Sequence, residues 1–248
     1  MGEPRPQAVT AIAQAYPDRV EVRGRDLARE LMGHVGFTAY FHLLLTGSEP
    51  TDAQREFLDL VLVAIAEHGL MPTNVAARMT LAADPRSLQG AVAAGILGAG
   101  PVLLGTAEEC ALLLAAAVAD GRPAEDVVRE HREAGRRVPG FGHPVHRPLD
   151  PRAERILELA DERGVAGAHV AYARELRDAL GLTMNVSLPI AAVMLDLGYE
   201  PAAVKAVPIL ARTASLLAHL AEERGRPLGL MLAGAAEGAV RYEPDARG

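Results

Sequence analysis

Apolar side chains recur along most of this chain at the spacing of amphipathic helices. Residues 52–67 show the i, i+3, i+4 pattern of a half-buried helix, with apolar positions at Phe57, Leu58, Val61, Leu62 and Ile65. Thr51 precedes this run as an N-cap, and Gly69 follows it as a helix stop. The pattern predicts a helix that covers an apolar core with one face.

Proline positions predict where further helices begin. Pro123 follows the Gly121 turn and opens a predicted helix that runs to about Arg136. Asp150 is a predicted N-cap with Pro151 in the first helical position. The apolar stretch 199–220 begins near Pro201 and contains Pro208, which should kink or divide a helix there.

The most apolar run, residues 90–104, predicts a buried helix and its exit turn. It contains four glycines and a proline and is short for a membrane span. No stretch shows sustained strand alternation between hairpin turns. The fold class predicted is therefore all-α, and the many alanines and glycines indicate close helix–helix approach.

Composition narrows the classes of partner. The 248 residues are half hydrophobic and carry a net charge of −7, with few aromatic residues and no basic block. This balance argues against nucleic acid as the main partner, and with the apolar run too short for a span, no membrane partner is expected. The single cysteine, Cys110, cannot form an internal disulfide and is predicted to be a packed thiol. Since residues 1–17 lack the pattern of a secretory signal, a cytoplasmic location is expected.

One segment, residues 136–155, concentrates chemically useful side chains. It reads RRVPGFGHPVHRPLDPRAER, with two glycines, four prolines, two histidines and five arginines. Gly140 and Gly142 would let backbone N–H groups approach a ligand closely. His143 could donate a hydrogen bond to an oxygen that gains negative charge. The alternative is a solvated basic loop that leads into a helix.

The same segment resembles the signature of the citrate synthase superfamily, especially its short citryl-CoA lyase-like members. The shared elements are a Pro-Gly-aromatic-Gly-His turn at residues 139–143 and Asp-Pro-Arg at residues 150–152. Further stretches are similar in family order: VEVRGRDLARELMGHVGFTAYFHLLLTGSEPT, AEHGLMPTNVAAR, GAGPVLLGTAEE, MNVSLPIAAVMLDLG and ILARTASLLAHLAEE. The resemblance runs over residues 20–245 and implies a two-domain helical enzyme fold.

The resemblance assigns roles to four residues that would touch the substrate. His143 would hydrogen-bond the oxygen that is carbonyl in one state and hydroxyl in the other, and His68 would contact the same substrate. Arg152 and Arg212 would bind carboxylates, a task that suits the planar guanidinium fork. Taken alone, His68 is equally a histidine at a helix C-terminus, and Arg212 a solvated surface residue.

Coenzyme A is the implied cosubstrate, bound as a thioester, and no metal is expected. Arg147 matches a position that contacts a CoA phosphate, and Arg136 or Arg137 could assist. Gly140 and Gly142 complete the predicted CoA-binding set. The remaining histidines have no matching role and are interpreted as structural or surface residues, with His146 left open: His34, His42, His131, His169 and His219.

Two departures from the family pattern affect catalysis. Leu103 stands where a histidine would bind the thioester oxygen, a departure that lyase-type relatives share. Ser187 stands where the catalytic aspartate belongs, and serine is a poor proton-transfer group without an adjacent base. Ser187 is kept among the predicted catalytic positions, with Glu67 and Glu108 as candidate replacements for the aspartate.

Four functions remain open at this stage. The first is a carbon–carbon lyase that splits citryl-CoA, or a related 3-hydroxy-carboxyacyl-CoA, into a 2-oxo acid and acetyl-CoA. The second is a synthase that condenses acetyl-CoA with a 2-oxo acid, which Leu103 disfavours. The third is a CoA-ester or tricarboxylate binding protein without catalysis, which Ser187 favours. The fourth, a plain helical interaction protein, leaves the glycine–histidine loop unexplained.

The resemblance also implies an organisation into domains and subunits. A large helical domain would comprise residues 1–105 and 199–248, and a smaller one residues 106–198, with the active site in a cleft between them. A homodimer is expected, built through helices of the large domain. Relatives supply a further arginine from the partner subunit; Arg226 and Arg241 are the candidates here, and neither has matching spacing.

Overall fold

The computed structural model describes residues 8–100, 104, 106–142 and 146–243. The chain divides into two compact units, Met1–Asp59 and Leu60–Gly248, so the boundary falls inside helix α2 (Asp52–Ala66). The predicted division of the chain into domains 1–105 with 199–248 and 106–198 stays a prediction.

The first unit contains a small antiparallel sheet that the sequence pattern did not predict. Its strands are β1 (Ala13–Ala15), β2 (Val20–Val22) and β3 (Arg25–Asp26), paired in that order. They lead into a short π-helix η1 (Leu27–Leu31) and helix α1 (Phe37–Thr46). Strands of two or three residues are too short to show alternation, which explains why the pattern missed them. A small core of Val22, Leu31 and Leu43 holds this unit together.

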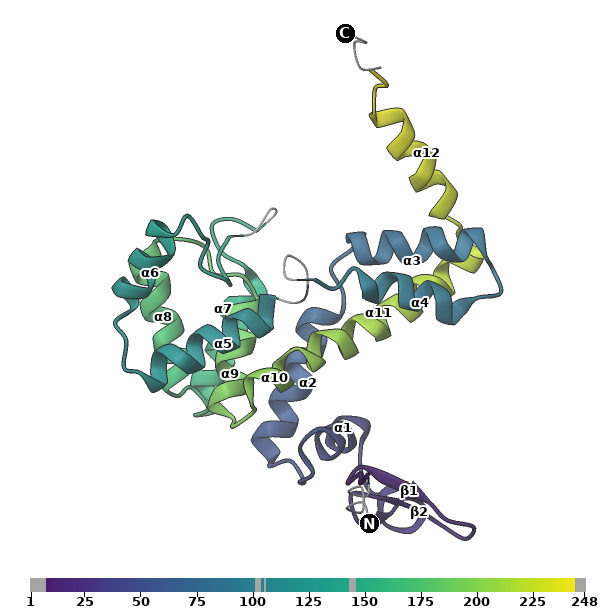
Figure 1. Cartoon of the computed structure of the whole chain (residues 1–248), viewed down its shortest axis with the longest axis horizontal. Helices are drawn as coiled ribbons and strands as arrows, with labels where there is room; N and C mark the ends of the chain where they lie inside the picture. The colour runs from purple at the N-terminus through teal and green to yellow at the C-terminus, as the bar shows by residue number, and fades with distance from the viewer. Residues whose placement is uncertain (1–7, 101–103, 105, 143–145, 244–248) are drawn as a thin grey trace, which may run out of the picture. The chain divides into compact units, whose positions relative to one another are not determined.

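The second unit is helical apart from isolated bridges, so the all-α prediction is confirmed for most of the chain (Figure 1). Its helices after α2 are α3 (Pro72–Ala83), α4 (Leu88–Leu97), α5 (Thr106–Ala119), α6 (Ala124–Glu133), α7 (Pro151–Glu162), α8 (Ala168–Leu180), α9 (Ser187–Asp196), α10 (Pro201–Val204), α11 (Ala206–Gly225) and α12 (Gly229–Ala239).

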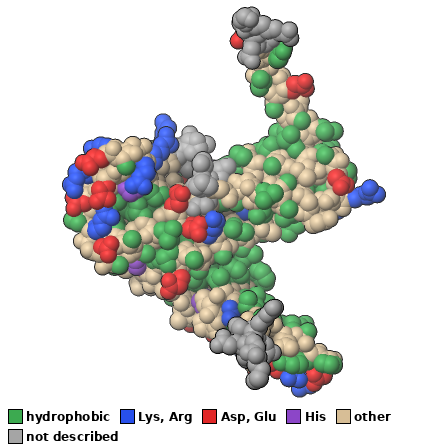
Figure 2. Space-filling model, viewed as in Figure 1, with side chains coloured by type: hydrophobic (Ala, Val, Ile, Leu, Met, Phe, Trp, Pro, Cys, Tyr) green, Lys and Arg blue, Asp and Glu red, His purple; other side chains and the backbone are tan. Residues whose placement is uncertain are grey.

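Two groups of helices pack within this second unit. Helices α5, α7 and α8 all pack against α9, in which every residue from Leu188 to Leu195 is buried. Helices α3, α4 and α11 pack on one another, and α12 packs on α3. In Figure 2 charged side chains gather over the helices around α9, whereas uncharged side chains dominate over α3 and α4.

The predicted helix starts and breaks agree with the structure. Thr51 forms a capping box with Gln54: the backbone N–H of Gln54 donates to Thr51 Oγ1 at 3.1 Å, and Gln54 Oε1 accepts from the Thr51 N–H at 2.9 Å. Asp150 caps α7 by accepting the Arg152 N–H at 3.0 Å. The helix that contains Pro208 breaks at Lys205, because Pro208 has no N–H to donate to the carbonyl of Val204.

The prediction of a buried helix near residue 90 is only partly right. Only Ala91 and Gly95 of α4 are buried, and Leu97 is 86% exposed, because α4 contacts α3 and α11 with one face. A Cβ added at Gly95 would lie 2.7 Å from Leu216 Cδ1, which confirms the close helix approach expected from small residues. The exit turn at residues 101–103 lies outside the described residues.

The stretch Pro201–Gly225, which includes α11, is the one candidate membrane span among the described residues, by length and composition alone. A core helix passes the same test. The buried residues of α11 include Leu216 and Leu220, which pack with Ala77, Leu81 and Ala91 of α3 and α4. This packing identifies α11 as a core helix, and it presents the predicted ligand residue Arg212 from its buried face.

Candidate functional site

The glycine loop at residues 140–142 lies alongside the segment that precedes α9. The Gly142 N–H donates to the carbonyl of Thr183 at 2.8 Å, and the Asn185 N–H donates to the carbonyl of Gly140 at 2.9 Å. The Asn185 side-chain amide donates to the Gly142 carbonyl at 3.2 Å. The Ser187 N–H in turn donates to Asn185 Oδ1 at 3.0 Å, so Asn185 ties the loop to the first turn of α9.

The two loop glycines serve different purposes. Gly140 is buried at φ +87°, and a Cβ there would lie 2.7 Å from Leu188 Cβ and 2.9 Å from Cys110 Sγ. Gly142 is exposed at φ +83°, with no atom within 4 Å of an added Cβ. Burial also raises the pKa of the Cys110 thiol, as predicted for a packed cysteine. Gly140 is therefore required by packing, while the open side of Gly142 leaves room for a ligand.

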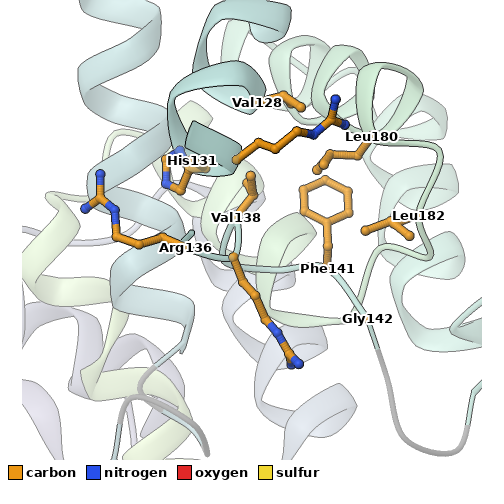
Figure 3. Close-up of a pocket in the computed structure, with 10 residues that line it drawn as sticks. Val128, His131, Arg136, Val138, Phe141, Gly142, Leu180 and Leu182 are labelled. Atoms are coloured by element: carbon orange, nitrogen blue, oxygen red, sulfur yellow. The ribbon is translucent and has the colours of Figure 1, made fainter. Parts of the chain in front are cut away.

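A pocket of about 470 Å³ adjoins this loop (Figure 3). Phe141, Leu180 and Leu182 lie together on one side of it, and His131 and Arg136 lie on another. The complete lining is Val128, His131, Arg132, Arg136, Arg137, Val138, Phe141, Gly142, Leu180 and Leu182. Apolar walls with several guanidinium groups suit a ligand that has both a ring and negative charge.

Of the residues predicted to bind CoA, Gly142 and Arg137 line this pocket, together with Arg136. Gly140 is buried close to Leu188 and Cys110, and the lining does not include it. Arg147 is exposed in the segment before α7. His143 and Leu103 lie outside the described residues.

His68, in the turn between α2 and α3, lies against His146. Their Nε2 atoms are 3.0 Å apart, and the ring centroids are 5.2 Å apart at an interplanar angle of 59°. Burial lowers the pKa of His68, and the positive charges of Arg152 and Arg212 lower it further, while Asp150 opposes them. The structure therefore brings together three predicted substrate residues, His68, Arg152 and Arg212, and adds His146.

Arg212 is a buried cation with incomplete hydrogen bonding. Its side chain on α11 is 4% exposed, and Nη1 donates to Asn74 Oδ1 at 3.0 Å. Its buried Nε has no hydrogen-bond partner among the described residues. Burial lowers the pKa of Arg212 and Arg152 adds to the effect, whereas Glu67 opposes it. A buried N–H without an acceptor is unfavourable, so a carboxylate ligand would relieve this site.

Arg152 is held by the residue that caps its own helix. Asp150 is fully buried; its Oδ1 accepts from Arg152 Nε at 3.1 Å and its Oδ2 from Nη2 at 2.8 Å. Burial would raise the pKa of Asp150, but the Arg152 side chain and backbone N–H lower it below its usual range. The Asp-Pro-Arg motif thus places a positively charged group at the N-terminus of α7 in one fixed orientation.

The two carboxylates suggested as replacements for the aspartate are both engaged. Glu67 Oε1 accepts from the N–H groups of His68 at 2.9 Å and Gly69 at 2.6 Å, and Oε2 accepts from Ser215 Oγ at 2.5 Å and His219 Nε2 at 3.0 Å. Burial raises the pKa of Glu67, whereas these hydrogen bonds lower it. The net result is a pKa below the usual value. Glu108 pairs with Lys205 Nζ at 2.8 Å. Glu67 is thus stabilised as an anion, which makes it a weaker base.

Sequence reasoning missed a set of polar residues behind His68. His219, interpreted as structural or surface, links Glu67 to the buried Arg78, and Asn74 binds Arg212. The available signal was a polar stripe on the otherwise apolar α11. Its members follow Arg212 at helical spacing, three, seven and eleven residues later: Ser215, His219 and Glu223.

The candidate arginines for a subunit contact lie on the surface. Arg226 follows the end of α11, and Arg241 pairs with Glu243. Within the part of the chain that the structure describes, no group of three His, Cys, Asp or Glu residues could hold a metal ion.

The chain belongs to the citrate synthase family. Residues 6–229 match the family described as citrate synthase, C-terminal domain, which confirms the resemblance drawn from the motifs. The structure is similar to citryl-CoA lyase from Hydrogenobacter thermophilus, with a TM-score of 0.81 and 30% identity, covering 87% of this chain and 86% of that one.

Two other relatives extend the comparison. ATP citrate lyase from Methanosaeta concilii, solved in complex with (3S)-citryl-CoA, shares the fold with a TM-score of 0.81 and 18% identity, covering 99% of this chain and 43% of that one. Citrate/2-methylcitrate synthase from Bacillus subtilis is 27% identical over 200 residues, which cover 76% of this chain and 53% of that protein. The chain thus spans about half the length of this curated relative.

Proposed function

We propose that the protein is a carbon–carbon lyase that splits citryl-CoA, or a related 3-hydroxy-carboxyacyl-CoA, into a 2-oxo acid and acetyl-CoA. The observation that carries this proposal is the buried Arg212, whose Nε has no partner in the described part of the chain and which lies within electrostatic reach of Arg152 and His68. A buried guanidinium with an N–H that has no acceptor among the described residues, near a second arginine, suits a substrate with more than one carboxylate. Similarity to a citryl-CoA lyase over most of both chains supports the lyase direction.

The carboxylates of the substrate would divide between the two arginines. Arg212 would donate through Nε, the atom that lacks a partner. Arg152 already donates from Nε and Nη2 to Asp150, so it would offer the remaining N–H groups of its guanidinium. His68, which both arginines influence electrostatically, would hydrogen-bond a substrate oxygen.

The pocket beside the glycine loop supports binding of coenzyme A. Arg132, Arg136 and Arg137 supply positive charge for phosphates, while Phe141, Leu180 and Leu182 supply an apolar wall for a planar ring. Arg147 would contact a CoA phosphate, as the family resemblance implies.

Cleavage needs a proton to leave the hydroxyl group of the substrate. The bond between the hydroxyl-bearing carbon and the thioester CH₂ then breaks, and the electron pair passes to the thioester as an enolate. The enolate carbon finally takes up a proton to give acetyl-CoA. By resemblance, His143 would hydrogen-bond the oxygen on which charge develops.

Ser187 favours a second candidate, a CoA-ester or tricarboxylate binding protein without turnover. It stands at the first residue of α9, and its hydroxyl cannot replace a carboxylate in proton transfer without a base. Under this alternative the arginine cluster and the pocket would keep their binding roles.

The deciding experiment incubates the purified chain with citryl-CoA and follows the release of oxaloacetate and acetyl-CoA. We expect cleavage by the native protein and its loss in His143→Ala and Arg212→Met, with Arg86→Met as a surface control. Binding of citryl-CoA without cleavage would establish the binding protein instead. Formation of an acyl-CoA adduct from acetyl-CoA and a 2-oxo acid, without net cleavage, would establish a synthase.

We also propose that the protein is a homodimer in the cytoplasm. Exposed apolar side chains on α12, Leu230 at 74% and Met231 at 56%, support burial of this helix by a second copy. Sedimentation of the native chain and of Leu230→Glu tests the proposal, since a dimer built on α12 should dissociate in the variant.

A further inference from the structure

The proton-transfer group is the missing part of the proposed mechanism. Ser187 replaces the family aspartate, and the two candidate carboxylates and Asp150 are engaged elsewhere: Glu67 in four hydrogen bonds, Glu108 with Lys205 and Asp150 with Arg152. The contacts of Glu67 and Asp150 stabilise these carboxylates as anions and lower their pKa values, and Glu108 is held in an ion pair. Another base must therefore act.

We propose that His146, hydrogen-bonded to His68, is the catalytic residue that takes the place of the aspartate in proton transfer. This inference rests on the proposed lyase function. The Nε2–Nε2 distance of 3.0 Å is that of a hydrogen bond between two imidazoles. His68 lies in the arginine cluster, so the pair reaches the site where the substrate carboxylates would bind.

The two rings must share their hydrogens in an ordered way. One ring donates its Nε2 hydrogen and the other accepts it through a lone pair, and a neutral donor ring has its second lone pair on Nδ1. When that Nδ1 takes up a proton, the donor ring passes its Nε2 hydrogen to the second ring. The second ring then carries hydrogens on both nitrogens and can release one.

The pair therefore conducts one proton from oxygen to carbon. The substrate O–H bond breaks and an N–H bond forms on the pair; the carbon–carbon bond breaks to leave the enolate of the thioester. An N–H bond of the pair then breaks as the methyl C–H bond of acetyl-CoA forms. The step needs no other reactant, and the pair returns to its neutral form.

The surroundings of His68 favour its neutral form. Arg152 on α7 and Arg212 on α11 face His68 with positive charge, and Asp150 before α7 opposes them. Burial and the two arginines lower the pKa of His68, so its ring is neutral at pH 7. Histidine is the side chain whose ordinary pKa, about 6.5, lies closest to neutrality.

The test measures citryl-CoA cleavage between pH 5 and 8 by the native chain, His146→Gln and His34→Gln, with citrate affinity measured by calorimetry. We expect His146→Gln to lose about 10²–10⁴ in kcat and the acid limb of the profile, while citrate affinity stays within about threefold. His34 is exposed in the first unit, and its variant should match the native protein. Thermal unfolding shows whether His146→Gln is folded. His146→Asn is a second variant without a titrating side chain, for use if the first does not fold.

Two results would overturn the inference while the lyase function stands: His146→Gln with native kcat, or a loss of rate and affinity together under an unchanged pH profile. A loss of turnover in Ser187→Ala as large as that expected for His146→Gln would assign the proton to the serine instead. If the native chain cleaves no citryl-CoA, the proposed function itself fails and the relay fails with it.

Discussion

Arg78 fixes the tautomer of His219. The buried guanidinium, 1% exposed on α3, donates to His219 Nδ1 from Nη2 at 2.8 Å and from Nε at 3.1 Å. Because an arginine side chain only donates, Nδ1 must be an acceptor and the ring hydrogen lies on Nε2. That hydrogen points to Glu67 Oε2 at 3.0 Å. A chain of hydrogen bonds thus runs from α3 through α11 to the turn that holds His68.

Replacing Arg78 should destabilise the protein. Its Nη1 donates to Glu223 at 2.8 Å, and Glu223, 5% exposed, also accepts from the N–H groups of Leu228 and Gly229 at the start of α12. Arg78→Met leaves that carboxylate buried without its cation, at a cost of about 3–5 kcal/mol.

Urea denaturation measures the effect of Arg78→Met on the free energy of unfolding. Arg224→Met is the matched control, since Arg224 is exposed on the neighbouring helix α11 and its loss should change stability by less than about 0.5 kcal/mol. Equal midpoints for both variants would show that the buried network contributes little to stability.

Gly140 and Gly142 allow a matched test of packing against backbone conformation. Both have positive φ, so alanine costs about 1–2 kcal/mol at either position. Only at Gly140 does the new Cβ also meet Leu188 and Cys110, at 2.7 and 2.9 Å. Overpacking of that kind adds about 1–3 kcal/mol.

Gly140→Ala should therefore unfold at a clearly lower urea concentration than Gly142→Ala. If the open side of Gly142 contacts coenzyme A, the order should be reversed for ligand binding. Gly142→Ala should then weaken CoA binding more than Gly140→Ala does, although it is the more stable variant. Equal stability losses in the two variants would mean that the α5–α9 packing beneath the loop adapts to the methyl group.

Local features of the fold could be predicted from the sequence because they depend on neighbouring residues. The Thr51 capping box, the Asp150 cap and the break before Pro208 each follow from a few adjacent side chains. The three short strands could not be predicted, because pairs such as Glu21 with Asp26 depend on turns that show no periodicity.

The candidate site could be predicted only where a motif named its residues. His68, Arg152 and Arg212 were found by resemblance, and the structure brings them within electrostatic reach of one another. His146 and Asn74 were not assigned, because their partners lie 78 and 138 residues away along the chain. The orientation of Arg152 toward Asp150 also depends on burial, which sequence spacing does not reveal.

Stability should fall as the pH falls below 6.5. The pKa of folded His68 is lowered from 6.5, so below that value the unfolded chain binds more protons and unfolding becomes more favourable. His42, whose pKa is lowered by burial, acts in the same direction. The carboxyl pKa values of Asp150 and Glu67 are also lowered, so their contribution, present above pH 4.5, is lost in stronger acid.

Thermal unfolding at a series of pH values tests whether stability falls as the pH falls. His68→Gln should flatten the decline between pH 6.5 and 5 and leave the decline below pH 4.5 unchanged, while His34→Gln should change neither. A native protein that gains stability between pH 6.5 and 5 would contradict the lowered pKa of His68.

Arg212→Met should weaken citrate binding and leave the free energy of unfolding nearly unchanged. Without ligand, Arg212 is a desolvated cation whose Nε finds no partner among the residues that the structure describes, so an apolar side chain of similar length should leave stability within about 1 kcal/mol of the native value or raise it. Asn74 Oδ1 would still accept from Thr73 Oγ1 at 3.0 Å, so the substitution leaves no new unsatisfied acceptor.

Affinity for citrate should fall by roughly 30-fold or more, since removing one partner of a buried charge pair costs about 2–5 kcal/mol. Calorimetric titration and urea denaturation of Arg212→Met and the surface control Arg86→Met measure both quantities. A variant that unfolds easily yet binds citrate normally would make Arg212 a structural residue and remove the main support for a carboxylate site.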